Sequence, residues 1–402
     1  MNIPKLRFKE FTDEWVYYKY KDIFNLNQGL QIPITERFLD YAPNRFFYIT
    51  NEFLKPSSKK SYYIENPSPN VICTKEDILM TRTGNTGKVI TNIAGVFHNN
   101  FFRIKYNPKN FNKDFICCIL NQNKIQNKIL TLAGSSTIPD LNHKDFYSIK
   151  SRFPKLKEQE KIAKFINTVD KKIENIENTI SSLENQKKGL LHQIFSQKLR
   201  FKDENGNNYP NWEKKKLGKL LSITSSKRVH EADWTTSGIP FYRARDIVSI
   251  FNNKPISKIY ISEKLYEECS SSCGKISEND LLVTGVGTIG IPYLVKKSDK
   301  FYFKDGNIIW LKNSPAIYGK YLFYIFISSY VQKQINMMTG KGTVGTYTIK
   351  NAKDTNILLP CLEEQTKIAD FLSAFDRKLE NQKAQLEHWQ QIKKGLLQQM
   401  FV

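Results

Sequence analysis

The chain has 402 residues, of which 40% are hydrophobic and 13% aromatic, and its 61 Lys and Arg against 39 Asp and Glu give a formal net charge of +22. The length predicts two or three domains, and the composition excludes a disordered or low-complexity protein. The positive charge favours a polyanion such as DNA or RNA as a partner, although a lysine-rich coding bias would raise the charge without one.

Cysteine spacing and hydropathy indicate a cytoplasmic protein. The six cysteines form no CxxC pair and have no His or Cys partners at zinc-finger spacing, which favours free thiols. They are Cys73, Cys117, Cys118, Cys269, Cys273 and Cys361. The first residues, MNIPKLRFKEF, lack an apolar signal core, and no apolar run reaches the roughly 20 residues that cross a bilayer. We therefore expect no membrane partner.

The first head, residues 1–153, is predicted to mix strands and helices. Short β-rich runs such as RFFYIT lie between turns that contain Gly, Pro and Asn. KDFICCILNQNKIQNKIL, residues 113–130, has a helical pattern, and the head ends in a Gly/Ser/Thr-rich loop at residues 134–137. The second head, residues 198–359, repeats these parts, with GIPFYRA as a strand and YGKYLFYIFISSYVQKQINMM, residues 318–338, as a helical stretch.

A duplication 206 residues apart relates the segments that follow the heads. PKLKEQEKIAKFINTVDKKIEN from Pro154 matches PCLEEQTKIADFLSAFDRKLEN from Pro360, and the match continues without a gap to KKGLLHQIF and KKGLLQQMF. The heads repeat more loosely, as in DILMTRTGNTG and DLLVTGVGTIG. A repeat at a fixed offset defines the units of a fold. We therefore predict two related heads, each followed by a long helix.

A heptad seam runs along each predicted helix, residues 154–197 and residues 360–402. The apolar residues alternate at spacings of four and three, which predicts coiled-coil pairing. The seam residues are Ile162, Ile166, Val169, Ile173, Ile176 and Ile180 in the first helix and Ile368, Leu372, Phe375, Leu379, Leu386 and Trp389 in the second. Lys187 and Lys393 interrupt the seam at the same place, where a polar residue can fix the register.

The order of heads and helices predicts how the helices pair. The second helix must run back along the first if the two pair, because the second head is built between them. The expected fold is α+β, with two mixed α/β domains in a pseudo-two-fold repeat, separated by an antiparallel pair of long coiled-coil helices. Helices of about 35–40 residues measure roughly 55–60 Å, which allows heads up to about 16–18 base pairs apart on DNA. The alternative is that each helix packs on its own head.

Several polar and basic residues suit contact with DNA. Arg matches guanine O6 and N7, Asn matches adenine, and Lys, Ser and Thr bind phosphates, although all these residues are common on any surface. The candidates are Thr50, Asn51, Arg82, Asn85, Lys88, Ser135, Ser136 and Thr137 in the first head, and Arg243, Arg245, Lys341, Thr343 and Thr346 in the second. Thr50 and Asn51 are the counterparts of the two arginines at 243 and 245.

The segment Gly285-Val-Gly-Thr-Ile-Gly290 matches the GxGxxG pattern of dinucleotide-binding sites. Pro292 disfavours the helix that such a site requires, and the repeat partner at residues 82–88 lacks the first glycine. We therefore interpret the segment as a tight turn between strands. No catalytic, metal or ATP-binding pattern stands out, since the five histidines are scattered through the sequence.

The duplicated helix motifs, their KKGLL endings and the GxxG turns of the two heads resemble the specificity subunit of type I restriction-modification systems. The residues that carry this resemblance are PKLKEQEKIAKFI from Pro154, PCLEEQTKIADFL from Pro360, and the glycine pairs Gly84/Gly87 and Gly287/Gly290. The resemblance covers the whole chain. It implies a non-catalytic, DNA-binding subunit of a DNA methylation complex. Its target-recognition domains would be residues 1–153 and 198–359, and its spacer helices residues 154–197 and 360–402.

The resemblance also implies partners. Double-stranded DNA would be read as a split target, one half by each head, with the helix pair setting the gap. Two modification (methyltransferase) subunits would dock on the helices and head flanks, and restriction (translocase and nuclease) subunits could join. No cofactor would bind this chain, because S-adenosylmethionine, ATP and magnesium belong to the partner subunits.

Two other functions fit parts of the sequence. A coiled-coil adaptor that binds proteins and not DNA would explain the helices and leave the charge incidental. An enzyme that uses the GxGxxG turn would carry a bound nicotinamide or flavin. A steep loss of DNA affinity with rising salt favours the specificity subunit over both.

Overall fold

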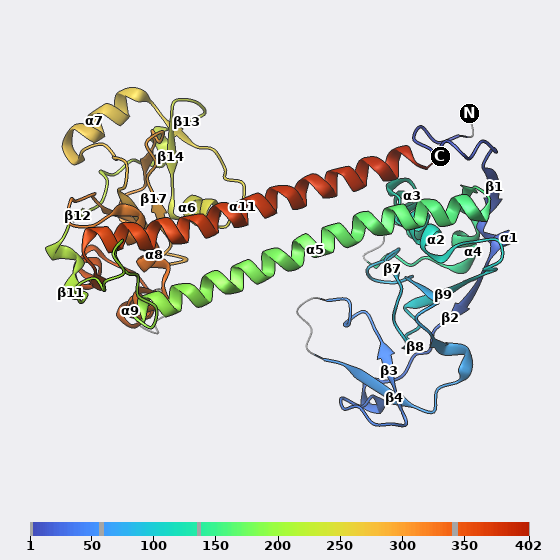
Figure 1. Cartoon of the computed structure of the whole chain (residues 1–402). Helices are drawn as coiled ribbons and strands as arrows, with labels where there is room; N and C mark the ends of the chain where they lie inside the picture. Colours follow the sequence, from blue (N-terminus) through green and yellow to red (C-terminus); the bar gives the residue numbers. More distant parts are fainter. Residues whose placement is uncertain (1–2, 56–59, 135–137, 340–344, 402) are drawn as a thin grey trace. The chain divides into compact units, whose positions relative to one another are not determined.

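The computed structural model describes residues 3–55, 60–134, 138–339 and 345–401. It divides into two compact units, unit 1 with Met1–Glu177 and Ala384–Val402, and unit 2 with Asn178–Lys383 (Figure 1). The two long helices are α5 (Leu156–Phe195) and α11 (Leu362–Gln399), and each contributes to both units. Each unit therefore contains one head and a segment of each helix.

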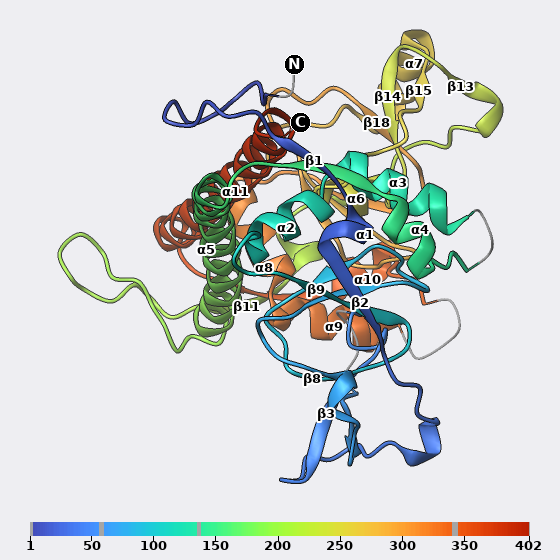
Figure 2. The same cartoon turned by 90° about the vertical axis from the view of Figure 1, so that its right-hand side faces the viewer.

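Unit 1 contains two four-stranded sheets and a two-stranded ribbon. The sheets have the strand orders β2-β9-β6-β7 and β4-β3-β8-β5, and the second lies farther from α5 than the first (Figure 2). The ribbon pairs β1 with β10. The bounds are β1 (Val16–Lys19), β2 (Phe24–Gln28), β3 (Arg45–Ile49), β4 (Tyr62–Glu65), β5 (Ile72–Cys73), β6 (Ile78–Thr81), β7 (Val89–Ile90), β8 (Gly95–Phe97), β9 (Phe101–Tyr106) and β10 (Lys150–Phe153).

Unit 2 repeats this arrangement, with sheets β12-β19-β16-β17 and β13-β15-β14-β18 and the ribbon β11-β20. In both units one strand pair of the second sheet is parallel, β3 with β8 and β14 with β18. The bounds are β11 (Glu213–Lys216), β12 (Ile223–Thr224), β13 (Trp234–Thr235), β14 (Ile239–Tyr242), β15 (Tyr260–Ile261), β16 (Leu281–Thr284), β17 (Pro292–Leu294), β18 (Tyr302–Phe303), β19 (Ile308–Leu311) and β20 (Asn356–Leu359).

The central strands β6 and β16 are buried throughout because each packs on both faces. Successive side chains of a strand point to opposite faces. Ile78 and Met80 accordingly join the core beneath the helices of unit 1, whereas Leu79 joins a separate core against the second sheet. Leu281 and Leu282 divide in the same way in unit 2.

The helical stretch of each head consists of two helices. Residues 113–130 form α2 (Lys113–Leu120) and the start of α3 (Asn123–Ala133), and residues 318–338 form α8 (Gly319–Ile327) and α9 (Ser329–Thr339). The amide of Gln126 donates to the carbonyl of Leu120 at 2.6 Å, and that of Gln332 donates to the carbonyl of Phe326 at 2.8 Å. These bonds satisfy carbonyls that a helix end leaves free. α8 is the core helix that its apolar sequence predicts.

The remaining helices are short. In unit 1 they are α1 (Tyr20–Ile23), α4 (His143–Ser148) and the 3-10 turns Ile34–Glu36 and Pro69–Val71. In unit 2 they are α6 (Ala244–Phe251), α7 (Glu263–Cys273), α10 (Ile349–Asp354) and the 3-10 turns Leu217–Lys219 and Glu231–Asp233. Among the described helices, none is both long and apolar enough to cross a membrane.

The end of a long helix completes the main core of each unit. In unit 1 Met400 and Phe401, just past α11, are buried among head residues, and Phe401 stacks on Phe115 at a centroid distance of 5.3 Å. In unit 2 Ile194 and Phe195, at the end of α5, are buried in the same manner. The helix that starts on one head thus supplies core residues to the other.

The start of α5 packs with the end of α11 in the core of unit 1, and the end of α5 packs with the start of α11 in the core of unit 2. The two helices therefore run antiparallel within each unit, as predicted, and an equivalent ion pair joins them in both. In unit 1 Lys393 of α11 lies 2.5 Å from Asp170 of α5, and in unit 2 Lys187 of α5 is paired with Asp376 of α11. These two pairs are repeat mates, 206 residues apart at both partners. The lysines that interrupt the heptad seam therefore meet carboxylates on the opposite helix, which defines the register.

The seam residues of α5 are covered more fully than those of α11. In α5, all but the half-buried Ile173 are buried: Ile162, Ile166, Val169, Ile176 and Ile180. In α11, Ile368 and Leu372 are buried, whereas four seam residues are half-buried: Phe375, Leu379, Leu386 and Trp389. The second helix therefore leaves part of its apolar stripe accessible.

One buried contact is the same in both units and anchors each long helix to its head. Glu158, 2% exposed, accepts from Arg7 at 2.7 and 2.8 Å and from the Trp15 indole at 3.3 Å. Glu364, fully buried, accepts from Arg200 at 2.8 and 2.9 Å and from the Trp212 indole at 2.7 Å. A buried carboxylate needs such partners, because an unpaired charge is costly to bury.

Candidate nucleic-acid interface

The glycine turn of head one links β6 to β7. Gly84 and Gly87 have φ values of 87° and 88°, which glycine adopts without strain. The Thr81 hydroxyl donates to the carbonyl of Asn85 and accepts from the amide of Lys88 at 2.9 Å. The turn is therefore fixed from within, and the side chains of Asn85 and Lys88 are exposed on it.

The GxGxxG segment of head two is the equivalent turn. It lies between the antiparallel strands β16 and β17, so the interpretation as a tight turn is confirmed. The Thr284 hydroxyl donates to the carbonyl of Thr288 at 2.6 Å, and Gly287 and Gly290 have φ values of 70° and 77°. No helix follows these glycines, and the geometry is not that of a dinucleotide site.

Each turn is tied to a helix by the same amide that ends α2 or α8. Gln126 donates to the carbonyl of Gly87 at 2.9 Å, and Gln332 donates to the carbonyl of Gly290 at 2.8 Å. This shared contact identifies the turn as part of the common scaffold of both heads.

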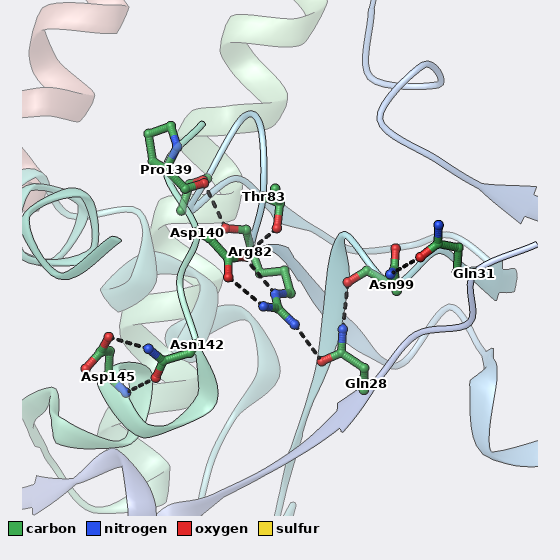
Figure 3. A network of polar contacts seen from close by, with 10 residues as sticks. Gln28, Gln31, Arg82, Thr83, Asn99, Pro139, Asp140, Asn142 and Asp145 are labelled. Atoms are coloured by element: carbon green, nitrogen blue, oxygen red, sulfur yellow. Dashed lines mark hydrogen bonds and ion pairs between the residues drawn. The ribbon is translucent and has the colours of Figure 1, made fainter. Parts of the chain in front are cut away.

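A polar network extends from the turn of head one (Figure 3). Arg82 donates to both carboxylate oxygens of Asp140, at 3.0 and 2.7 Å, and to the side chain of Gln28 at 3.2 Å. Gln28 in turn donates to the carbonyl of Asn99 at 2.7 Å, and the Asn99 amide donates to Gln31 at 2.7 Å. The sequence drew attention to Arg82 alone, and the structure joins it to a row of amide side chains.

Thr50 and Asn51 follow β3, and Asn51 contacts this turn. Thr50 is buried, with 6% exposed. Asn51 is half-buried and donates to the carbonyl of Thr83 at 2.9 Å. Thr50 is therefore buried within head one, and Asn51 is hydrogen-bonded within it.

In head two the two candidate arginines differ sharply. Arg243 is 7% exposed and holds Asp246 through contacts of 2.7 and 3.0 Å, so its guanidinium has a role inside the head. Arg245 is exposed and lines a cleft of about 690 Å³. Trp234, Lys304 and residues 286–288 of the turn line the same cleft.

The terminal loops lie largely outside the described residues. Ser135, Ser136, Thr137, Lys341 and Thr343 fall there. Thr346 is described and exposed. DNA contact stays a prediction for every candidate.

Burial makes one side chain of head one neutral at physiological pH. Burial, and to a lesser extent the nearby Arg37, lowers the pKa of His98 to about 4. The Nδ1 atom of His98 accepts from the backbone amide of Asn100 at 3.0 Å, which also requires that this nitrogen is unprotonated. Head one therefore carries a neutral side chain at residue 98.

The sequence did not indicate several residues around these turns, namely Gln28, Gln31, Asn99, Arg228, Lys304 and Asp305. Gln28 ends β2 and the others lie in loops, and the two copies of these segments share no obvious motif, so the repeat offered no alignment. Strand pairing alone brings them together. Among the described residues, no group of three or more His, Cys, Asp or Glu side chains could hold a metal ion.

Comparison with known families gives a match over most of the chain. A family model described as "Type I restriction modification DNA specificity domain" matches residues 12–185 and again residues 209–388. Each match spans one head and much of the helix that follows it. The two copies found from the sequence thus correspond to two copies of one known domain.

Curated relatives agree with this match. The type I restriction enzyme MjaVIII specificity subunit of Methanocaldococcus jannaschii is 23% identical over 419 residues, which cover 98% of this chain and 94% of that protein. A putative type I restriction enzyme specificity subunit of Haemophilus influenzae is 30% identical over 162 residues, or 40% of this chain and 39% of that protein.

Solved structures share the fold. The S subunit of a type I restriction-modification system from M. genitalium superposes with a TM-score of 0.62 at 18% identity, covering 100% of this chain and 99% of that one. A chain solved for the assembly and conformational transition of a type I R-M system gives a TM-score of 0.56 at 15% identity, covering 95% and 96%.

Proposed function

Because this chain belongs to the type I restriction-modification DNA specificity family, we propose that its two heads read the two halves of a split, asymmetric DNA target. The chain is a DNA specificity subunit and not an enzyme in its own right. The observation that carries the proposal is the duplication of one head-and-helix unit with different loop residues in the two copies. Two equal scaffolds with unequal contact residues suit two unequal half-sites.

The proposed DNA-contacting surface of each head centres on its glycine turn. In head one it includes Arg82, Asn85 and Lys88, and in head two Arg245 and Thr346. Phosphate contacts from such residues would position the head, and contacts to base edges would specify the sequence. The buried Thr50 and Arg243 would act by holding neighbouring residues rather than by touching DNA.

The helices α5 and α11 would set the distance between the half-sites. Residues 154–197 and 360–402 form the proposed spacer, and residues 1–153 and 198–359 the proposed recognition domains. The repeated Lys–Asp pairs support this role, because a fixed register gives a fixed helix length between heads. The partly accessible stripe of α11 supports the docking of further subunits on the helix pair.

The proposed partners are double-stranded DNA, two modification subunits and restriction subunits. S-adenosylmethionine, ATP and magnesium would be bound by those subunits and not by this chain. The proposed place of action is the cytoplasm, where the chain would act on DNA.

Methylation mapping tests the proposal directly. The chain is expressed with a compatible modification subunit in a host that lacks other methyltransferases, and adenine methylation is read by long-read sequencing. A new split, asymmetric motif that depends on this chain is expected. No new methylation, with a modification subunit that is active beside another specificity subunit, would refute the proposal.

A further inference from the structure

The two heads share their scaffold. Residues that recognise different half-sites must therefore lie at equivalent positions where the two heads carry different side chains. The shared contacts include the Gln126 and Gln332 amides, the Thr81 and Thr284 hydroxyls, and the buried glutamates. Residues that differ at equivalent positions beside the glycine turns are therefore candidates for base contact.

Strand pairing defines the equivalent positions. Leu26 pairs with Ile104 in unit 1, and Ile223 pairs with Leu311 in unit 2. Five residues after Leu26 stands Gln31, and five residues after Ile223 stands Arg228. The loop after the first sheet strand therefore carries an amide in head one and a guanidinium at the same place in head two.

The loops opposite are equivalent as well. The backbone amide of His98 donates to the carbonyl at the end of β3, and that of Lys304 donates to the carbonyl at the end of β14, both at 2.9 Å. The residue after each, Asn99 or Asp305, faces the loop just described. Asn99 donates to Gln31 at 2.7 Å, and Arg228 lies 3.0 Å from Asp305. An amide pair in head one thus takes the place of an ion pair in head two.

The side chain of Arg228 is available for a ligand. The Arg228 side chain is 72% exposed, and it contacts Asp305 through Nε. The two terminal nitrogens take no part in that contact. An exposed ion pair of this kind contributes little to stability, so exchange of partners costs little. Arg82 in head one differs, because its Nε and both terminal nitrogens already have acceptors within the head.

The charge around the two pairs follows the same difference. Beside the pair in head two lie Lys227 and Lys304, and Lys304 lines the cleft with Arg245. The counterpart of Lys304 in head one is the uncharged His98, and that of Lys227 is Leu30. Head two thus presents cations where head one presents neutral and amide groups.

These side chains match different bases. A guanidinium donates two parallel hydrogen bonds to guanine O6 and N7, and a side-chain amide donates to adenine N7 while accepting from N6. We propose that the Gln31–Asn99 pair reads an adenine in one half-site and that Arg228, oriented by Asp305, reads a guanine in the other. The inference rests on the proposed function and names the base chemistry of each half.

The loop geometry fits this division of roles. The Ser225 hydroxyl donates to the carbonyl of Ile308 at 2.9 Å and accepts from the amide of Gly306 at 3.2 Å, which fixes the loop that carries Asp305. Gln28, the counterpart of Ser225, holds Asn99 in head one. Asp305 and Asn99 are therefore positioning residues, and Arg228 and Gln31 are the ones expected to touch the bases.

The experiment measures methylation motifs for the whole chain with a compatible modification subunit. The variants are Arg228→Gln, Arg228→Lys and Gln31→Ala, and Lys264→Gln serves as a control that removes an exposed charge of head two outside the cleft. For Arg228→Gln we expect discrimination at one G·C pair of one half-site to fall by about 10- to 100-fold, with the other half unchanged. Arg228→Lys should keep the overall affinity better and still lose discrimination, because lysine lacks the planar fork.

Gln31→Ala should relax one A·T position of the opposite half-site by a similar factor, and Lys264→Gln should leave the motif intact. A uniform loss of methylation at all sites in Arg228→Gln would mark a phosphate contact and overturn the inference. The inference would also be overturned if the position at which Arg228→Gln loses discrimination is not a G·C pair in the wild-type motif. The proposed function would still stand in that case. If the wild-type chain directs no motif, the proposed function itself fails and the inference with it.

Discussion

Removal of the buried Glu364 carboxylate should destabilise unit 2 strongly. In Glu364→Ala the Arg200 guanidinium loses its bidentate partner and the Trp212 indole loses its acceptor. Loss of one partner of a buried ion pair costs about 3–5 kcal/mol. Arg200 is 23% exposed and can regain some water, so we expect the lower end, about 3 kcal/mol.

Urea unfolding followed by circular dichroism measures this cost. With a urea dependence of about 3 kcal/mol/M for a unit of this size, the midpoint of unit 2 should fall by about 1 M. Glu184→Ala is the matched control, because Glu184 forms an exposed pair with Lys383 in the same unit that is worth less than about 1 kcal/mol. Equal midpoints for the two variants would refute the reasoning that Glu364 anchors the helix to the head.

Three further expectations concern the turn, the histidine and the helix register. In Gly290→Ala the new Cβ would lie 3.0 Å from Ile335 Cδ1 at a φ of 77°. Thermal melting should therefore show a loss of about 1–2 kcal/mol in stability. Gly206→Ala is the control, because its Cβ would meet nothing within 4 Å and only the positive φ would cost stability. Because the pKa of His98 falls from 6.5 to about 4 on folding, the unfolded chain binds this proton more readily. Stability should therefore be lost as the pH drops from about 6.5 towards 4, and His98→Asn should flatten that part of the pH profile; an unchanged profile would contradict the assignment. Lys187→Asp should lower the melting temperature by placing a carboxylate against Asp376, and the double variant Lys187→Asp/Asp376→Lys should recover most of the loss; no recovery would mean that the pair does not set the register.

The sequence predicted the parts of the fold that depend on period and repetition. The 206-residue offset and the heptad seam were enough to predict two related units joined by antiparallel helices, because apolar spacing determines which face of a helix is buried. The match of Lys187 and Lys393 indicated a shared register, but the carboxylates that pair with them, Asp376 and Asp170, were seen only in the structure. The turn interpretation of the GxGxxG segment followed from Pro292 and the missing glycine in its repeat partner.

The candidate site was harder to predict, because its residues come from loops with no periodic pattern. Arg243 looked like a surface residue, yet it directly precedes α6 and its guanidinium is buried in an ion pair with Asp246 in the first turn of that helix. Arg228 and Asp305 are 77 residues apart and meet only through the pairing of β12 with β19. A single sequence carries no signal for that contact.

The burial of Met400 and Phe401 in the core of head one has a consequence for synthesis. The other buried residues of this core lie at or before Ile166 in the chain, yet the core stays open beside Trp15 and Phe115 until residues 400 and 401 have also been synthesised. Over that interval the nascent head exposes an aromatic surface to other nascent chains and chaperones. A frameshift shortly before residue 400 would leave it permanently in that state, so a lesion at the end of α11 should act on a head built from residues more than 230 positions earlier in the chain.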